Sequence, residues 1–532
     1  MPSCGEAVIE LIERSGASTV FGIPGVHTLE LYRGLGASGL RHVAPRHEQA
    51  AAFMADGWAR VTGRPGVCIL IGGPGLTNAI TPIAQAYHDS IPMLVISGAV
   101  PAAQRHLGEI HDLPDQRALL AQVTAFSHTI EDPEELPDVF TRAAHVFASE
   151  RPRPVHIAIP VDVLKRPTPV PDWSPPAPDR PRADPGAVAR AADLLFAAAR
   201  PLVLLGGGAR DAGAEALAVA RALDAPVGLT INARGTIPDD DPLCLGSALS
   251  FPPVSDLLRD ADATLLVGAQ FSDLELWGLS EPLSLRGLVR IDIDAEQLSR
   301  RWVPEVGLHG DAAATLTSLA DALADGASAR PEDGGASNGA AASAVREARA
   351  ALDPPHEVGR FRPLLDVLDR VLPADRIIAG DSTQPVYAAN HLLGMATPRS
   401  WLMPIGYGCL GCALPMALGA KLAAPERPVL AMAGDGGFQF TIQELATARD
   451  LGLPVVTLVY DNRGYGEIRD AMDGAGVGHL GTDATTHDLL QIAAGFGVTA
   501  VRSGSLTELE QHLTDALGAA GPTVIEYAET GS

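Results

Sequence analysis

Two polar segments near the carboxyl end of the chain have the composition of a site for a metal-bound diphosphate. Asp435, Gly436 and Gly437 follow one apolar run, and Asn462 follows the next, 27 positions after Asp435. A carboxylate oxygen and an amide oxygen are hard ligands that suit Mg²⁺, and the glycines let the backbone approach an anion closely. These residue types predict a site that binds Mg²⁺ and a diphosphate group.

The elements expected around these segments place them at one edge of a sheet. The apolar runs Val429–Ala433 and Val455–Tyr460 are predicted to be buried strands. In parallel α/β sheets the ligand crevice lies outside the carboxyl ends of the strands. A helix that we expect to begin near Phe440 directs its first N–H groups to the same place, which favours an anion there.

The whole chain alternates short β-branched runs with helical patterns. Besides the two strands above, the predicted strands are Val67–Ile71, Met93–Ser97, Leu202–Leu205, Thr264–Val267, Leu288–Ile293 and Arg376–Ala379, and Glu48–Arg60 is a predicted helix. Such alternation is typical of parallel sheets with crossover helices. The predicted fold class is therefore α/β, with three consecutive parallel-sheet domains.

Two segments of unusual composition divide the chain. Residues 166–185 are rich in proline, which excludes a regular helix or a central strand, and residues 326–344 are small, polar and rich in glycine and alanine. We therefore expect an N-terminal domain at residues 1–165, a central domain at 186–325, a linker at 326–358 and a C-terminal domain at 359–532.

Composition and charge exclude several classes of function. The formal net charge of −25 argues against nucleic acid or an anionic membrane as the main partner, because both need a basic surface. No apolar stretch approaches the ~18 residues of a transmembrane helix, and the N-terminus lacks the pattern of a signal peptide. The five cysteines are an odd number in a long chain, which favours reduced thiols and a cytoplasmic location. Cys409 and Cys412 are expected to be small buried residues at a turn rather than zinc ligands.

The Gly-Asp-Gly segment with its following asparagine resembles the fingerprint of thiamine-diphosphate-dependent enzymes of the acetolactate synthase and 2-oxo acid decarboxylase superfamily. The resemblance covers essentially the whole chain. Its N-terminal motifs are a first cofactor loop at 22–25, the catalytic glutamate helix at 46–57 and the loop beside the aminopyrimidine at 73–78, which include Pro24, Gly25, Glu48, Pro74 and Asn78. The resemblance implies a pyrimidine-binding domain, a central Rossmann-like domain and a diphosphate-binding domain.

The resemblance also assigns roles to single residues. Glu48 matches the family's glutamate that hydrogen-bonds N1′ of the aminopyrimidine, which favours the imino tautomer whose 4′-nitrogen takes the thiazolium C2 proton. Gly408 matches a carbonyl that accepts from the 4′-amino group, and Leu410 matches the large apolar residue under the folded cofactor. Gln384 matches a position that contacts the diphosphate.

The implied cofactors are thiamine diphosphate and Mg²⁺. The metal ligands are expected to be the side chains of Asp435 and Asn462 and the backbone carbonyl of Gly464. In the acetolactate synthase branch the central domain binds FAD. Residues 205–208 contain a glycine run, but a short glycine run is weak evidence, and we do not expect FAD in this chain.

Two histidines are candidates for proton transfer near the reacting carbon. They are His27 and His111, and histidine is the side chain most often used for proton transfer at neutral pH. The alternative for each is a loop histidine hydrogen-bonded to the backbone.

Finer similarities favour one branch of the superfamily. Segments 21–32, 113–117, 124–128 and 464–469 resemble 5-guanidino-2-oxopentanoate (2-ketoarginine) decarboxylases more than acetolactate synthases. The predicted activity is therefore the non-oxidative decarboxylation of a 2-oxo acid to an aldehyde and CO₂. The alternative is an acetolactate synthase-like carboligase, which joins the decarboxylated fragment to a second carbonyl substrate.

A guanidinium tail would need carboxylates in a forked geometry. The acidic candidates in matching segments are Glu109, Asp112, Glu467 and Asp470, and each has a solvated surface charge as its alternative. We favour Asp112 and Glu467, the latter because it lies three residues past Gly464.

The resemblance implies that Glu48 and Asp435 of two different subunits touch one cofactor. A homodimer or homotetramer with its sites at the subunit interface is expected, acting on a small 2-oxo acid. A non-catalytic relative that binds the cofactor for regulation or assembly is the alternative class. The presence of Glu48, Asp435 and Asn462 favours the enzyme.

Overall fold

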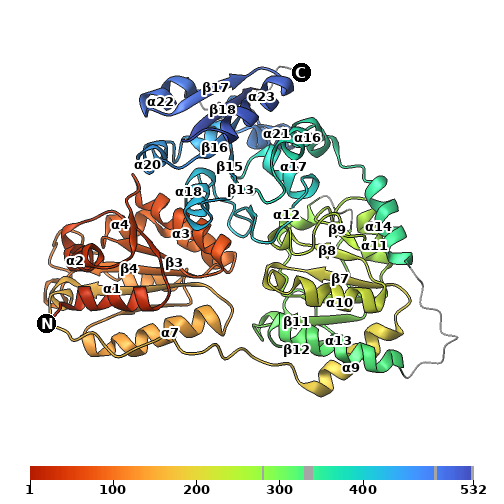
Figure 1. Ribbon diagram of the computed structural model, residues 1–532, viewed down its shortest axis with the longest axis horizontal. Coiled ribbons are helices and arrows are strands. Elements are labelled where there is room, and N and C mark those ends of the chain that lie inside the picture. The colour runs from red at the N-terminus through yellow and green to blue at the C-terminus, as the bar shows by residue number, and fades with distance from the viewer. Residues whose placement is uncertain (278, 280, 329–338, 484–487, 529–532) are drawn as a thin grey trace. The chain divides into compact units, whose positions relative to one another are not determined.

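A computed structural model of the chain describes residues 1–277, 279, 281–328, 339–483 and 488–528. These fall into two compact units, one made of residues 1–179, 377–383 and 406–532, and the other of residues 180–376 and 384–405. The chain contains three six-stranded sheets with helices on their faces (Figure 1), and every strand pair with a described register is parallel. This confirms the predicted α/β class with three consecutive parallel-sheet regions.

The N-terminal sheet has apolar strands because helices cover it. Its strands, in spatial order, are β2 (Arg41–Val43), β1 (Thr19–Phe21), β3 (Gly66–Leu70), β4 (Met93–Ala99), β6 (Pro154–Pro160) and β5 (Phe126–Thr129). Alternate residues of β3 and β4, such as Ile69 and Ile96, share one buried cluster with α1 (Cys4–Arg14) and α7 (Leu136–Ala148). The remaining helices are η1 (Val26–Thr28), α2 (Leu29–Ala37), α3 (Glu48–Thr62), α4 (Pro74–Asn78), α5 (Ile80–His88), η2 (Ala102–Gln104), α6 (Gln116–Ala121), η3 (Pro133–Glu135) and α8 (Val161–Leu164).

Helix α3 carries Glu48 as its first residue. His47 caps it in an extended conformation, and its Nδ1 accepts from the Gln49 N–H at 3.2 Å. The helix ends at Gly63, whose φ of 71° is the left-handed conformation that glycine adopts readily. The predicted helix Glu48–Arg60 is thus confirmed and extends two residues further.

The central sheet is covered on both faces, which explains why whole strands are apolar. Its order is β12 (Val306–His309), β11 (Leu288–Asp292), β10 (Ala263–Val267), β7 (Pro201–Leu205), β8 (Val227–Leu229) and β9 (Cys244–Gly246). Val203 and Leu205 join one cluster, while Leu202 and Leu204 join another on the opposite face. The helices are α9 (Pro185–Ala197), η4 (Gly207–Ala209), α10 (Gly213–Leu223), η5 (Ile231–Ala233), α11 (Val254–Asp260), α12 (Asp273–Leu276), η6 (Gln297–Ser299), α13 (Ala312–Ser328) and α14 (Ala340–Ala350).

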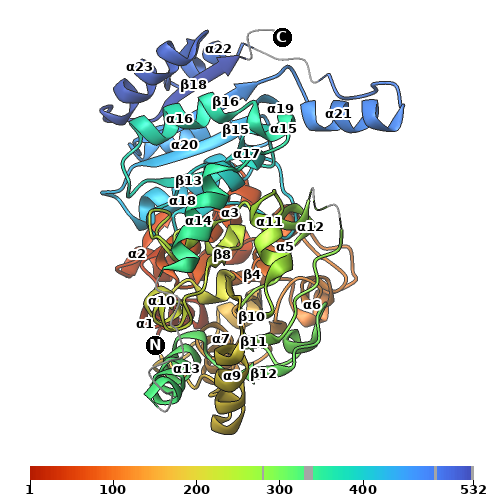
Figure 2. The same cartoon turned by 90° about the vertical axis from the view of Figure 1, so that its right-hand side faces the viewer.

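The third sheet carries the Gly-Asp-Gly segment. Five strands lie in the order β13 (Ile377–Gly380), β15 (Val429–Gly434), β16 (Val455–Asp461), β18 (Thr523–Ala528) and β17 (Thr499–Ser503), and β14 (Trp401–Leu402) is the sixth. The helices are α15 (His356–Gly359), α16 (Arg362–Val371), α17 (Gln384–Leu392), α18 (Ala413–Ala423), α19 (Asp435–Phe438), α20 (Glu444–Asp450), α21 (Gly466–Ala475), α22 (Leu489–Gly495) and α23 (Leu506–Leu517). Figure 2 shows α21 extending away from the strands of its sheet, and Gly466 is its only buried residue.

The helix expected to begin near Phe440 was misplaced. The short helix α19 begins at Asp435 directly after β15, and α20 begins only at Glu444. Glycine is unfavourable inside helices, so the sequence pattern predicted a turn where the two glycines in fact form the first helical turn. The helical N–H groups next to the end of β15 therefore belong to α19 and not to a helix that begins near Phe440.

The Pro-rich segment forms neither helix nor strand from residue 168 to residue 184. In the second expected linker, α13 runs to Ser328 and α14 begins at Ala340. The intervening residues 329–338 lie outside the described part of the chain. Among the described residues, no helix has both the length and the apolar character needed to cross a membrane.

Candidate active site

The N-terminal sheet brings several predicted cofactor residues together at the carboxyl ends of its strands. The Asn78 side-chain amide donates to Glu48 Oε2 at 3.0 Å. A Cβ on Gly75 would lie 3.3 Å from Glu48 Oε1 and 2.5 Å from Ile71 Cγ2, and a Cβ on Gly25 would lie 2.4 Å from Ile71 Cδ1. Gly25 and Gly75 therefore both pack closely against Ile71, Gly75 also lies next to Glu48, and Pro74 and Asn78 are exposed.

The two candidate histidines lie next to each other. The rings of His27 and His111 meet edge to face, with 5.1 Å between their centroids. Burial, followed by the nearby His111 and Lys165, lowers the pKa of His27, so this imidazole is neutral near neutral pH. Within the described part of the chain, His27 Nδ1 is buried with no hydrogen-bond partner. His111 has a φ of 67°, a conformation that few non-glycine residues adopt.

Asp435 is the buried centre of the predicted diphosphate site. Its side chain accepts the Gly464 N–H at 2.8 Å through Oδ2 and is 1% exposed. Burial, and then the neighbouring Asp461, raises its pKa to about 6. A buried carboxylate beside a second acid is costly without a cation, so the electrostatics of this site favour a bound metal ion.

The glycines beside Asp435 are required by close contacts. A Cβ on Gly436 would lie 2.8 Å from the Tyr465 ring, and one on Gly437 would lie 2.5 Å from Asp381 Oδ2 and 3.5 Å from Leu410 Cδ2. Leu410 thus lies against the Gly-Asp-Gly turn. Asp381 is fully buried, and it accepts the Gly411 N–H at 2.9 Å.

Hydrogen bonds from the following helix, α21, hold the loop that contains Asn462. Arg469 donates to the backbone carbonyls of Asn462 and Arg463, at 2.5 and 2.9 Å. Gly408, with a φ of 66°, lies in an exposed part of its loop. Gln384 belongs to the second compact unit, where it is the first residue of α17 and accepts from Arg360 at 3.0 Å.

The candidate substrate carboxylates lie in exposed segments. Asp112 is half-buried and accepts the His106 N–H at 2.6 Å. Glu467 and Asp470 lie exposed on α21, and Glu109 is exposed as well. The structure describes no group of three or more His, Cys, Asp or Glu side chains that would hold a metal in the described residues. The predicted magnesium site has a single carboxylate, so it would not form such a group.

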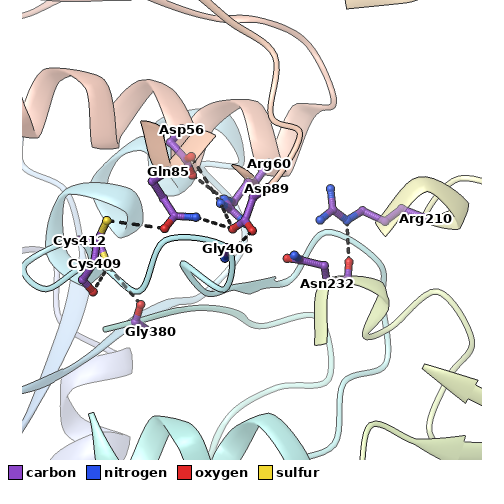
Figure 3. A network of polar contacts seen from close by, with 10 residues as sticks. All are labelled: Asp56, Arg60, Gln85, Asp89, Arg210, Asn232, Gly380, Gly406, Cys409 and Cys412. Atoms are coloured by element: carbon purple, nitrogen blue, oxygen red, sulfur yellow. Dashed lines mark hydrogen bonds and ion pairs between the residues drawn. The ribbon is translucent and has the colours of Figure 1, made fainter. Parts of the chain in front are cut away.

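A buried ion network contacts the loop that begins at Gly406 and contains Cys409 (Figure 3). Arg60 binds both Asp56 and Asp89, the latter at 2.8 Å, and all three side chains are at most 3% exposed. Burial acts to lower the pKa of Arg60, but the two carboxylates outweigh it and raise the pKa. Asp89 Oδ2 also accepts from Gln85 at 2.7 Å, and its Oδ1 accepts the Gly406 N–H at 2.8 Å. The network therefore anchors the start of the loop that begins at Gly406.

The cysteines of this loop belong to the same buried region. Cys409 Sγ contacts Gln85 Oε1 at 3.6 Å, and Cys412 Sγ contacts the Gly380 carbonyl at 3.5 Å. All five cysteines of the chain are free and buried. The prediction that Cys409 and Cys412 are small buried residues is confirmed.

Replacing Arg60 by methionine is expected to lower the free energy of unfolding by about 3–5 kcal/mol, because Asp56 and Asp89 stay buried without their cation. Urea-induced unfolding measures this. The control is Arg105→Met, which removes a 2.8 Å ion pair with Glu131 whose side chains are 32% and 51% exposed. That change is expected to cost less than about 1 kcal/mol. Equal unfolding midpoints for the two variants would contradict the prediction.

The network of Asp56, Arg60 and Asp89 was not predicted from the sequence. The spacing of Asp56 and Arg60 by four residues on an otherwise apolar helix was the available signal. Gln85 lies on α5 and Asp89 caps the end of that helix, so they have the same spacing, but nothing in the sequence connects them to Gly406. The role of Glu444 was not predicted either, because nothing in the sequence connects it to the distant residues that it contacts.

Comparison with known families agrees with this geometry. Three family models of thiamine pyrophosphate enzymes match: the N-terminal TPP binding domain at residues 2–119, the central domain at residues 188–319 and the C-terminal TPP binding domain at residues 381–527. The chain belongs to the thiamine pyrophosphate (thiamine diphosphate) enzyme family.

Individual relatives match almost from end to end. The chain is 44% identical to a probable 2-ketoarginine decarboxylase of Pseudomonas aeruginosa, over 98% of this chain and 93% of the relative. It is 30% identical to a probable acetolactate synthase large subunit of Methanocaldococcus jannaschii, over 98% of this chain and 91% of that protein. It is 31% identical to the large subunit of acetolactate synthase isozyme 3 of Escherichia coli, over 97% and 92%.

Proposed function

We propose that this chain is a thiamine-diphosphate- and Mg²⁺-dependent decarboxylase that converts 5-guanidino-2-oxopentanoate to an aldehyde and CO₂. The observation that carries the proposal is the 44% identity, along nearly the whole of both chains, to the probable 2-ketoarginine decarboxylase. The second candidate is an acetolactate synthase-like carboligase, which the relatives with 30% and 31% identity favour.

The residues of the third sheet fit the diphosphate and its metal. Asp435 is buried, burial and the neighbouring Asp461 raise its pKa, and glycines leave the backbone of the turn without side chains. Asp435, the Asn462 amide oxygen and the Gly464 carbonyl would hold Mg²⁺. The N–H groups of Gly436 and Gly437, at the start of α19, would face the diphosphate. The match of Gln384 to a position that contacts the diphosphate in the family stays a prediction.

The cofactor, when bound, supplies the thiazolium carbon that adds to the 2-oxo group and accepts the electrons released with CO₂. Glu48 would hold a proton at N1′ of the aminopyrimidine, and its hydrogen bond from Asn78 fixes its carboxyl group in the loop region. Pro24, Gly25 and Pro74 would contact the ring, Gly408 would accept from the 4′-amino group, and Leu410 would keep the cofactor bent.

His27 and His111 would transfer protons to and from the substrate. His27 is the stronger candidate for a proton acceptor, because its lowered pKa keeps it neutral. The rings of the two histidines are in contact, and the nearby His111 is one of the causes that lower the pKa of His27.

The central domain needs no flavin in this proposal. A Cβ on Gly206 would lie 2.3 Å from the Gly268 carbonyl oxygen, and one on Gly208 would lie 3.0 Å from Gly268 Cα. Close packing of two backbone turns accounts for these glycines without a nucleotide. We further propose a cytoplasmic homodimer or homotetramer in which each site combines Glu48 of one subunit with Asp435 of another.

Glu467 is proposed to bind the guanidinium tail of the substrate. A charge-assisted hydrogen bond contributes about 1.5–3 kcal/mol, so Glu467→Gln should lower the kcat/KM ratio of 2-ketoarginine to an apolar branched 2-oxo acid roughly ten- to a hundredfold. The measurement compares CO₂ release from 2-ketoarginine, pyruvate and the apolar acid. Asp473→Asn is the matched control, because it removes an exposed charge from the same helix, where Asp473 pairs with His479 at 2.8 Å.

Two results would argue against this substrate. An unchanged ratio in Glu467→Gln removes Glu467 from the substrate site. A wild-type preference for pyruvate, with acetolactate as the product, favours the carboligase instead.

A further inference from the structure

A buried carboxylate of the C-terminal region holds the backbone just before Glu48. The Arg46 N–H donates to both carboxylate oxygens of Glu444, at 3.0 and 3.2 Å, and the His47 N–H also donates to it. The Glu444 side chain is 0% exposed. Both segments belong to the same compact unit.

Helix α20 holds the Glu444 carboxyl group in one orientation. Glu444 is the first residue of α20, and the Thr447 hydroxyl, one turn further on, donates to Glu444 Oε2 at 2.6 Å. Leu445 and Ala448 are buried on the same helix. The Arg46 guanidinium pairs with Asp450 at the last residue of α20, at the surface. The segment before α3 is therefore fixed at two points along α20, one buried and one exposed.

The buried point acts on the end of α3 that carries Glu48. The first N–H groups of a helix have no partner inside the helix, and helix ends fray. Arg46 and His47 immediately precede Glu48, so the Glu444 carboxylate fixes the backbone one to two residues before it. The Glu48 side chain accepts a hydrogen bond from Asn78. The position of its carboxyl group thus depends on the backbone that Glu444 holds.

Burying the Glu444 carboxyl group costs stability, so this contact differs from ordinary apolar packing. Burial raises the pKa of Glu444 to about 7, and the hydrogen bonds from Thr447 and from the Arg46 N–H act in the opposite direction. A buried carboxyl group costs stability unless its hydrogen bonds are formed. Two backbone donors and one hydroxyl satisfy it here.

We propose that Glu444 is a positioning residue for Glu48: it fixes the start of α3, so that the Glu48 carboxyl group meets the aminopyrimidine in the geometry needed for proton transfer. The inference rests on the proposed role of Glu48. A misplacement of about 1 Å in an active site can lower the rate about a hundredfold. The effect should fall on kcat, because substrate contacts and the diphosphate site are unchanged.

The first experiment measures kcat, KM and cofactor affinity for three holoenzyme variants. Glu444→Met removes the acceptors at similar volume and should lower kcat by about ten- to a hundredfold, with KM and cofactor affinity unchanged. Glu444→Gln keeps one acceptor oxygen and should recover part of that loss. Asp450→Asn, the matched control, weakens only exposed contacts, those of Asp450 with Arg46 and Arg449, and should keep the wild-type kcat. If Glu444→Met does not fold, Glu444→Gln carries the test.

A double-mutant cycle then separates positioning from a general structural role. If Glu444 acts through Glu48, adding Glu444→Met or Glu444→Gln to Glu48→Gln should cost almost nothing more. Losses that multiply, or a wild-type kcat in both Glu444 variants, would overturn the inference while the proposed function stands. Failure of the proposed function has a different signature: the Glu48→Gln enzyme turns over like wild type, or wild type releases no CO₂ from any 2-oxo acid.

Discussion

Replacing Glu48 by glutamine is expected to lower the turnover of a 2-oxo acid by about 10²–10⁴-fold, the usual size of a general acid–base contribution. Glutamine keeps the shape of the side chain and its ability to accept from Asn78, which lies 3.0 Å away. It cannot share a proton with N1′ of the aminopyrimidine in the way that a carboxyl group does. Cofactor affinity should therefore change little, because the residues proposed to hold the diphosphate and its metal belong to the third sheet and not to α3.

Two measurements separate activation of the cofactor from its binding. Calorimetry gives the affinity for thiamine diphosphate, and the exchange of the C2 proton for deuterium in the bound cofactor reports activation directly. Glu10→Gln serves as the control, because Glu10 forms an exposed pair with Arg14 on α1 at 2.9 Å. Turnover of Glu48→Gln within about threefold of wild type, far below the range of acid–base effects, would remove Glu48 from the catalytic step.

The core strands were predictable because both faces of each parallel sheet are buried. The runs at 67–71, 264–267 and 429–433 contain apolar residues without alternation, and they became β3, β10 and β15 with shifts of one residue at their ends. Edge strands gave no comparable signal. Arg41–Val43, for example, is short and partly exposed, so its composition does not differ from that of a loop.

The predictable parts of the candidate site are the residues that directly follow a predicted strand, because the sequence near them shows where that strand ends. Asp435 and Gly464, 29 positions apart, are in contact because both follow neighbouring parallel strands. Contacts between distant segments were not predictable: Glu444 meets Arg46, and Asp89 meets Gly406, across 398 and 317 positions. Glu444, the first residue of α20, is visible in the sequence, but its partner is a backbone N–H, which every residue type except proline possesses.

The helix that follows β15 shows that helix propensity alone does not decide which residues form a helix. Asp435, Gly436 and Gly437 form the first turn of α19, although glycine disfavours helix by about 1 kcal/mol per residue. Contacts with Tyr465 and Asp381 leave no room for a Cβ at the two glycines. Tertiary packing therefore selects glycine at positions where helix propensity opposes it.

Replacing Asp435 by alanine is expected to abolish the Mg²⁺-dependent binding of thiamine diphosphate. The carboxylate is the only charged group among the three proposed metal ligands, and Mg²⁺ binds chiefly through carboxylates and phosphates. Alanine also leaves the buried Gly464 N–H without its acceptor at 2.8 Å. Asp435→Asn, which keeps an oxygen but not the charge, should bind the cofactor with intermediate affinity. Calorimetry with and without Mg²⁺ checks both variants, and an unchanged cofactor affinity in Asp435→Ala would exclude Asp435 from the site.

Co-expression shows whether the Asp435→Ala chain is otherwise intact and where each site is assembled. If a site combines Glu48 of one subunit with Asp435 of another, a mixed dimer of Glu48→Gln and Asp435→Ala chains contains one site with both residues intact. Random pairing in a symmetric dimer then restores about a quarter of the wild-type sites. If instead each site were built within one chain, every site in the mixture would lack one of the two residues, and no activity would return. Recovery of activity in the mixture, absent from each variant alone, would thus assign the loss in Asp435→Ala to the metal site and place the active sites between subunits.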